Sequence, residues 1–172
     1  MVDISRINNT LGKMYYYLNQ YNCVCVSVSG GSDSDLIVHM IATYFREFLP
    51  KVHFVFSDTG LEWNATKRHL DDLEQKYDIK IDRIRGMSVV TAVRKCGIPV
   101  ISKRHTDVID RYARNVPSGV RQINFDKTKA KGYAFSIKQR QMADAIKERG
   151  IKVSAKCCNY SKKYPMHQYY KK

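Results

Sequence analysis

The sequence predicts an α/β fold, a three-layer, doubly wound sheet of mainly parallel strands with helices on both faces. In the first 84 residues, short apolar runs typical of strands alternate with longer segments that have helical periodicity. Strands separated by helices pair in parallel, because each crossover returns the chain to the same end of the sheet. At 172 residues the chain can bury a full core, so we expect a single domain over residues 1–172.

Each element of the first half follows from a residue pattern. Ile4, Ile7 and Leu11 recur at helical spacing, whereas the run 23–28 is short, apolar and partly β-branched, which predicts a strand buried on both faces. Residues 79–84 alternate between apolar and polar side chains, which predicts a strand with one wetter face. The expected order is helix 4–20, strand 23–28, helix 34–48, strand 52–56, helix 63–77 and strand 79–84. The stripe expected to face the core from helix 34–48 is Leu36, Ile37, Met40, Ile41, Tyr44, Phe45 and Phe48.

The pattern of the second half is mainly helical. Ser88 is expected to cap a short helix that ends near Gly97, and a basic helix is expected over 102–115. Residues 115–133 contain a proline and two glycines without apolar periodicity, which predicts a loop. A helix over 136–149 and a short strand over 151–154 complete the expected elements.

A glycine turn joins the first expected strand to its helix, and it consists of Ser29, Gly30, Gly31, Ser32, Asp33 and Ser34. The N–H groups in the first turn of a helix have no intrahelical partner and lie at the positive end of the helix dipole. Two glycines let a phosphate approach the backbone without a Cβ in the way, and the serine hydroxyls can add donors. Ser32 is a candidate N-cap residue, with Asp35 three positions on as in a capping box. The turn therefore predicts a phosphate site, and a capped turn without a ligand is the alternative.

This turn resembles the SGGxDS signature of the PP-loop superfamily, which includes the ATP pyrophosphatases and the adenylyl-sulfate reductases. It differs from the P-loop of ordinary NTPases, which has four residues between its glycines and then Gly-Lys-Ser/Thr. The resemblance implies an adenine nucleotide alpha-hydrolase-like, Rossmann-like fold that binds an adenine nucleotide: ATP, adenylyl sulfate (APS) or its 3′-phosphorylated form (PAPS). Most members that use ATP carry Lys at the fourth position, where this chain has Ser32.

A second motif, DTGLEW at residues 58–63, follows the second expected strand. It resembles the DTG-x-E-aromatic segment of the phosphoadenosine phosphosulfate (PAPS) reductase family, which implies that this loop lines the nucleotide. Gly60 permits close approach of the backbone, and Thr59 and the Asp58 carboxylate can hydrogen-bond a ribose or a base. A DTG after a strand is as often a plain turn. The candidate ligands of this loop are Asp58, Thr59, Gly60 and Glu62.

Asp33 raises the question of a divalent cation. Its carboxylate would lie beside a bound phosphate, and two anions repel unless an ion such as Mg²⁺ lies between them. The alternative is a first-turn carboxylate that interacts favourably with the helix dipole.

Cys157 and Cys158 are followed by Lys and Pro and resemble the Cys-Cys half of the adenylyl-sulfate reductases, which helps to hold a four-iron cluster. The second cysteine pair of that family is missing from this sequence, and Cys23 and Cys25 are expected on opposite faces of their strand. A cluster needs four ligands, so we do not expect this chain to hold an Fe–S cluster by itself. Idle thiols and a reactive thiol, with its pKa lowered by neighbouring lysines, are the alternatives.

Positive charge is concentrated in the second half of the chain. Residues 1–100 hold 12 Lys/Arg and 11 Asp/Glu, whereas residues 101–172 hold 18 and 5. This basic part can serve a polyanion or a phosphorylated substrate, so nucleic acid is a candidate partner, and solvated helix faces are the alternative. The candidates for binding further negative charge are Lys103, Arg104, Arg111 and Lys156. With no signal peptide, no apolar run of bilayer length and an odd number of cysteines, we expect a cytoplasmic protein without a membrane partner.

From these motifs the chain is identified as a member of the PAPS reductase family, and the resemblance implies a basic part that is truncated relative to the family. The resemblance implies sulfonucleotide reduction or sulfur transfer, and thus an oxidoreductase or transferase of sulfur metabolism. Two alternatives stay open: an ATP pyrophosphatase that adenylates a substrate such as nucleic acid, and a nucleotide- or nucleic-acid-binding protein without turnover. No residue is assigned a catalytic role.

Overall fold

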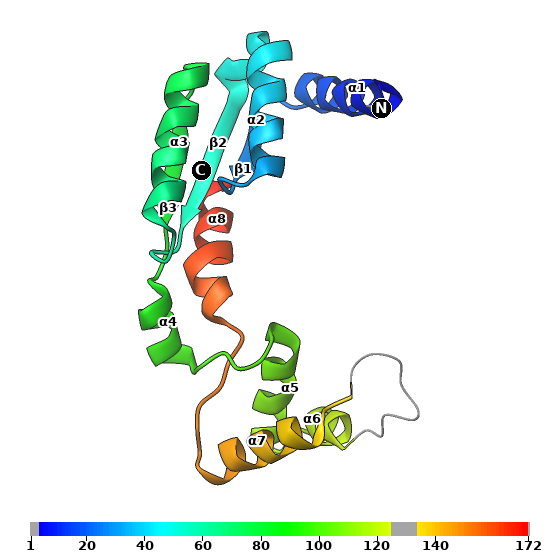
Figure 1. The fold of residues 1–172 in the computed structure, drawn as a ribbon, viewed down its shortest axis with the longest axis vertical. Coiled ribbons are helices and arrows are strands. Elements are labelled where there is room, and N and C mark those ends of the chain that lie inside the picture. The colour runs from blue at the N-terminus through cyan, green and yellow to red at the C-terminus, as the bar shows by residue number, and fades with distance from the viewer. Residues whose placement is uncertain (1–3, 125–133, 172) are drawn as a thin grey trace. The chain divides into compact units, whose positions relative to one another are not determined.

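The computed structural model describes residues 4–124 and 134–171, and the chain divides into two compact units. The first unit comprises Met1–Gly86 and Tyr164–Lys172, and the second comprises Met87–Lys163. Figure 1 labels the elements of both units. Whether the two units act as one domain stays a prediction. None of the helices within the described ranges combines the length and the apolar character that a bilayer crossing requires.

The first unit is built on a parallel three-stranded sheet, which confirms the α/β prediction. Its strands are β1 (Val24–Val28), β2 (Val52–Asp58) and β3 (Ile81–Arg85), in the order β1-β2-β3. Val28 pairs with Phe56, so the carboxyl ends of β1 and β2 lie at the same edge. Its helical segments are α1 (Ile4–Gln20), α2 (Ser32–Tyr44), the 3₁₀ segment η1 (Arg46–Lys51), α3 (Asn64–Tyr77) and α8 (Tyr164–Tyr169).

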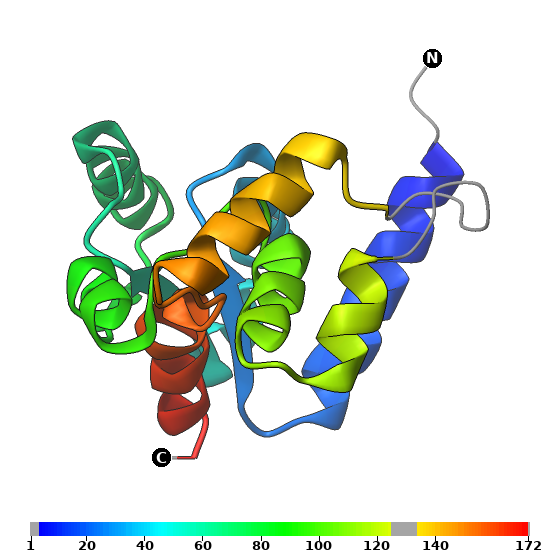
Figure 2. The ribbon, with the colours of Figure 1, turned by 90° about the horizontal axis from the view of Figure 1, so that it is seen from below.

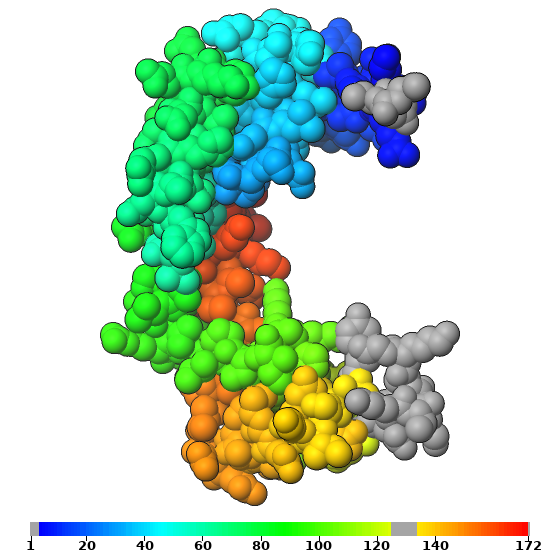
Figure 3. Space-filling view, in the orientation of Figure 1, coloured from blue at the N-terminus to red at the C-terminus, as the bar shows by residue number. Residues whose placement is uncertain are grey.

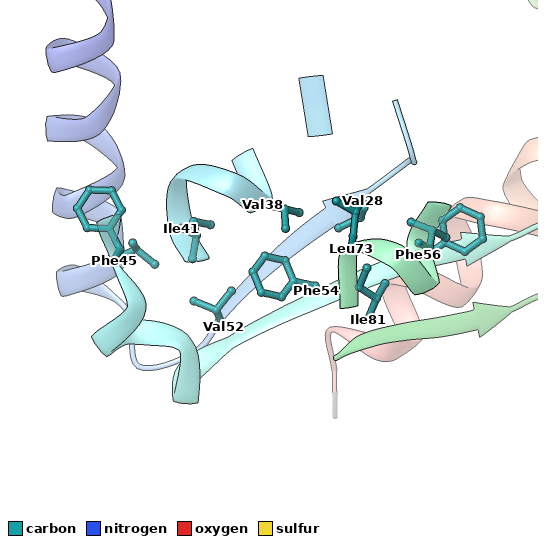
Figure 4. Packing of buried hydrophobic residues seen from close by; sticks show 11 residues of the cluster. Val28, Val38, Ile41, Phe45, Val52, Phe54, Phe56, Leu73 and Ile81 are labelled. Carbon is teal, nitrogen blue, oxygen red and sulfur yellow. The ribbon is translucent and has the colours of Figure 1, made fainter. Parts of the chain in front are cut away.

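The core of this unit lies between the sheet and the helices α1, α2 and α3. Figure 4 shows Phe54 of β2 among Val38, Ile41 and Val52, all of them buried. Leu70 and Leu73 of α3 also face this core, and α1 adds Leu18. In the space-filling view, α1 lies beside the α2–η1 region (Figure 3), where Tyr15 contacts the ring of Phe45.

The first strand differs from its prediction in two respects. Val24, Val26 and Val28 face the core, but Cys25 and Ser27 are exposed, so the expected burial on both faces is wrong. The reason is that α2 and α3 cover one face of the sheet, whereas on the other face α8 contacts β3, at the opposite edge of the described sheet. The placement of Cys23 and Cys25 on opposite faces is wrong as well, because side chains two residues apart in a strand point the same way.

The helix α2 also departs from its prediction. Its N-cap residue is Gly31, without a side-chain cap, so the capping box of Ser32 and Asp35 is wrong. Met40, Ile41 and Phe45 are buried as expected, but three members of the expected stripe are exposed by 41–57%: Leu36, Ile37 and Tyr44. The helix ends at Tyr44, where η1 follows, and its buried positions include Val38 and Ala42, which the expected stripe left out.

A hydrogen bond joins α8 to β3. The Tyr169 hydroxyl donates to Asp82 Oδ2 at 2.5 Å. Asp82 alternates with the core residue Ile81, so α8 packs on the face of the sheet opposite α2 and α3. The bond raises the pKa of Tyr169 to about 12 and lowers the pKa of Asp82.

The second unit is helical. It contains α4 (Val89–Cys96), α5 (Lys103–Ala113), α6 (Pro117–Ile123), α7 (Ile137–Glu148) and the π-helical segment η3 (Asn159–Lys163). Figures 1 and 2 show α5, α6 and α7 gathered around one core, which includes Ile109, Ile123 and Ile146. Ser88, Ser102 and Ser136 cap α4, α5 and α7 through side-chain hydrogen bonds, in agreement with the expected helix starts.

Two predictions for the second unit are wrong. The expected loop 115–133 contains the helix α6. Pro117 is the first residue of this helix, a position that favours proline. The part of that loop at 125–133 lies outside the described residues. The expected strand 151–154 is reduced to one parallel bridge between Val153 and Ile98.

Replacing Tyr169 tests the attachment of α8. Tyr169→Phe should lower the free energy of unfolding by about 1 kcal/mol at pH 7, because Asp82 loses its donor. In the wild type, this contribution should persist below pH 10, the ordinary pKa of tyrosine, and vanish as the pH rises to about 12. Urea unfolding followed by circular dichroism measures both effects. Tyr170→Phe is the matched control, and an equal loss in that variant would contradict the assignment.

Candidate functional site

The turn between β1 and α2 depends on Gly30. Its φ of 73° lies in the left-handed region, and an added Cβ would lie 2.7 Å from Cγ2 of Thr66 in the first turn of α3. Gly31 differs, since its φ is −107° and an added Cβ would meet only Ser29 Oγ, at 3.5 Å. Gly30 is therefore required by the fold, whereas a side chain at Gly31 would extend into open space at the N-terminus of α2.

The serines of the turn differ in their surroundings: one is buried and hydrogen-bonded to the backbone, and the others are exposed. The buried Ser34 hydroxyl donates to the Gly31 carbonyl at 2.8 Å and accepts the Ser29 N–H at 3.2 Å. Ser32 and Asp33 are exposed in the first turn of α2. The first N–H groups of a helix have no intrahelical acceptor, and in an exposed first turn this is the geometry of an anion site.

The loop after β2 is closed by the carboxylate of Glu62. This carboxylate accepts hydrogen bonds from the Thr59 N–H at 3.0 Å, the Thr59 hydroxyl at 2.6 Å and the Gly60 N–H at 3.0 Å. Asp58 Oδ1 accepts a second bond from Gly60 N–H at 2.8 Å. Thr59 and Glu62 thus satisfy each other within the loop, and their expected contacts with a nucleotide stay predictions.

These hydrogen bonds set the acidity of Glu62. Desolvation is the largest single effect and raises the pKa of its carboxyl, but the bonds from Thr59 together outweigh it and lower the pKa to about 2. Glu62 is therefore ionised at any physiological pH, and its charge holds the loop in one conformation.

Two contacts join the glycine turn and the start of α2 to α3, the helix that follows the second loop. Gly30 lies against Thr66, and Asp35 Oδ2 lies 2.6 Å from His69 Nε2. The other oxygen of Asp35 is buried, with no hydrogen-bond partner among the described residues. Sequence reasoning missed His69, because a single histidine in a helix carries no spacing signal that links it to Asp35.

The family model of the phosphoadenosine phosphosulfate reductase domain matches residues 23–116, more than half of the 172 residues. The chain belongs to this family. The matched region begins at β1 and includes both the glycine turn and the loop of Asp58–Glu62. Membership in the PAPS reductase family, part of the PP-loop superfamily, supports a nucleotide-binding role for the chain.

Two relatives of this PAPS reductase-family chain carry names without a stated activity. It is 41% identical over 76 residues to "Uncharacterized protein MJ0066" of Methanocaldococcus jannaschii, a match that covers 44% of the chain and 15% of the relative. It is 32% identical over 65 residues to "Uncharacterized protein YbdN" of Escherichia coli K12, covering 38% of the chain and 16% of the relative. The chain thus matches about one sixth of the length of these proteins.

The role of Cys157 and Cys158 as half of an Fe–S site stays a prediction for this PAPS reductase-family chain. They lie outside the region matched by the family, and an Fe–S cluster needs four ligands. Across residues 4–124 and 134–171, His, Cys, Asp and Glu side chains nowhere gather in threes that could hold a metal ion. Burial, and next the nearby Cys158, raise the pKa of the Cys157 thiol, so the expected lowering by neighbouring lysines is wrong there.

The basic residues singled out in the sequence all belong to the second unit. Arg111 contacts Ser118 Oγ at 3.2 Å and Gln122 Oε1 at 3.0 Å, so its guanidinium joins α5 to α6. Lys103 and Arg104 lie in the first turn of α5, and Lys156 follows the Val153 bridge. Their role in binding nucleotide charge stays a prediction.

Replacing Glu62 tests the closed loop. Glu62→Gln should lower the free energy of unfolding by about 1–2 kcal/mol at pH 7, because a neutral amide accepts the bonds from Thr59 and Gly60 less strongly. In the wild type, the contribution is complete above the ordinary pKa of 4.5 and is lost as the pH falls toward 2. Urea unfolding between pH 2 and 7 measures it. If Glu62→Gln kept the wild-type pH dependence in this range, Glu62 would not be its source.

Proposed function

We propose that the first unit binds an adenine nucleotide with its phosphates at the turn of Ser29–Ser34. The observation that carries this proposal is the turn itself: a left-handed Gly30 delivers the chain into α2, whose exposed first turn offers unpartnered N–H groups. Membership in the PAPS reductase family supports the adenine nucleotide as ligand.

The roles of the surrounding residues follow from their positions. The N–H groups of Gly31, Ser32 and Asp33 bind the phosphate oxygens, and the loop of Asp58–Glu62 lines the ribose or the base. Asp33 is exposed in the first turn of α2, where its carboxylate can share a Mg²⁺ ion with the phosphates.

The chemistry we propose is sulfonucleotide reduction or sulfur transfer. A nucleophile that attacks the sulfur of adenylyl sulfate releases AMP, whereas attack at the adenylyl phosphorus releases sulfate. In either case the N–H groups at the start of α2 stabilise the negative charge that develops on the phosphate. Ser32, in place of the lysine common among ATP-cleaving relatives, favours a sulfonucleotide over ATP as the substrate.

Gly31→Val tests the phosphate site without disturbing the fold. The valine side chain fits the backbone, since φ is −107° and the nearest atom to its Cβ is 3.5 Å away, but it occupies the approach of the phosphate. Loss of charge-assisted hydrogen bonds worth about 1.5–3 kcal/mol should weaken binding by about tenfold to a hundredfold. Calorimetric titration with AMP, ATP, adenylyl sulfate and its 3′-phosphorylated form measures the affinities.

Gly12→Val is the matched control, because Gly12 lies on α1 and nothing lies within 4 Å of an added Cβ. It should bind these nucleotides like the wild type. Equal affinities of the wild type and Gly31→Val would contradict the site, and binding of none of the four compounds by the wild type would contradict the function.

A further inference from the structure

The second unit contains a basic pocket lined by its own residues. It has a volume of about 640 Å³ and lies among α4, the ends of α5 and α7, and the segment 150–156. Its lining includes five cationic side chains: Lys95, Arg114, Lys147, Lys152 and Lys156. We define these five side chains and their surroundings as the basic pocket.

Among the described residues of this lining, Asp110 alone carries a carboxylate, and it is paired with Arg114. Asp110 accepts two hydrogen bonds from Arg114, one from Nε at 3.1 Å and one from Nη2 at 2.7 Å. Among the described residues, the four lysines of the basic pocket form no ion pair. Their positive charge is therefore available to a ligand.

Several of these lysines have defined positions. Lys152 Nζ donates to the Lys95 carbonyl at 2.8 Å, and Lys95 Nζ lies 5.3 Å from the ring centre of Tyr160. Lys147 Nζ lies 4.5 Å from the ring centre of Tyr112. Contacts with a carbonyl and with aromatic rings hold the ammonium groups in place without cancelling their charge.

The charge of the second unit and the residues that line the basic pocket together indicate the class of ligand. The second unit carries 18 Lys/Arg against 5 Asp/Glu, an excess far larger than one mononucleotide can neutralise. Beside the cations, the lining includes the Tyr160 ring and apolar side chains such as Ile146 and Ile151, which suit sugars and bases. We propose that the basic pocket binds the phosphodiester backbone of a nucleic acid. This site is independent of nucleotide binding by the first unit.

The experiment is an anisotropy titration of a fluorescent 20-nucleotide single strand between 50 and 200 mM KCl. Lys147→Gln/Lys156→Gln removes two charges from the basic pocket, and Arg121→Gln/Lys138→Gln removes two exposed charges of the same unit outside it. Each phosphate contact contributes about 0.7 to the slope of log Kobs against log salt. The pocket variant should therefore flatten the slope by about 1.4 and bind about 25-fold more weakly at 0.1 M KCl, while the control keeps the wild-type slope.

Every other outcome overturns the proposal. Equal losses in the two double variants would mean that the charge acts diffusely, and no binding by the wild type would exclude a nucleic acid. Tighter, pocket-dependent binding to vesicles of anionic phospholipid would indicate a membrane surface, and displacement by equimolar adenosine 3′,5′-bisphosphate would indicate a mononucleotide. Circular dichroism checks folding, and Lys156→Gln alone replaces the pair if the pair unfolds. Gly31→Val should bind the strand normally, which separates this test from that of the nucleotide site.

Discussion

The close approach of Gly30 to Thr66 is the contact on which the candidate site depends. It requires a residue without a Cβ, in a left-handed conformation, at the point where β1 passes into α2. The same contact places the first turn of α2 beside the first turn of α3. A second contact, between Asp35 and His69, also joins these two helices. The parallel register of β1 and β2 then brings the two family motifs to one edge of the sheet. The geometry of an anion site therefore arises from packing within the first unit, before any ligand is present.

The second motif, the loop of Asp58–Glu62, is stabilised by its own hydrogen bonds and also offers candidate ligands for a nucleotide. Glu62 directs its carboxylate into its own loop, where the N–H groups of Thr59 and Gly60 and the Thr59 hydroxyl surround it. The hydrogen bonds that close the loop restrict its conformations, which would reduce the entropy lost on binding the proposed nucleotide. The family motifs lie in the first unit, whereas most of the positive charge lies in the second. The first unit is nearly balanced, with 12 Lys/Arg and 11 Asp/Glu, and the second holds 18 Lys/Arg and 5 Asp/Glu. Small-molecule recognition and polyanion recognition thus fall to different units in the account proposed here.

Sequence reasoning predicted the features that local patterns determine. The alternation of strands and helices, the glycine turn, the cap at Ser88 and the helix starts at Ser102 and Ser136 follow from residues close together in the chain. It failed where tertiary contacts decide. Which face of β1 is covered depends on where helices distant in the sequence pack, so the exposure of Cys25 could not be read from its neighbours. Ser34 turned inward because Ser29 and Gly31 offered partners, and the bond between Asp35 and His69 spans 34 residues.

The most direct test of the central claim is a ¹⁵N–¹H NMR titration of the whole chain with adenylyl sulfate. We expect the largest chemical-shift changes at the backbone amides of residues 30–34 and smaller changes at residues 58–62. Gly31→Val should abolish the changes at residues 30–34. Shifts confined to the second unit, with the amides of residues 30–34 unmoved, would contradict it.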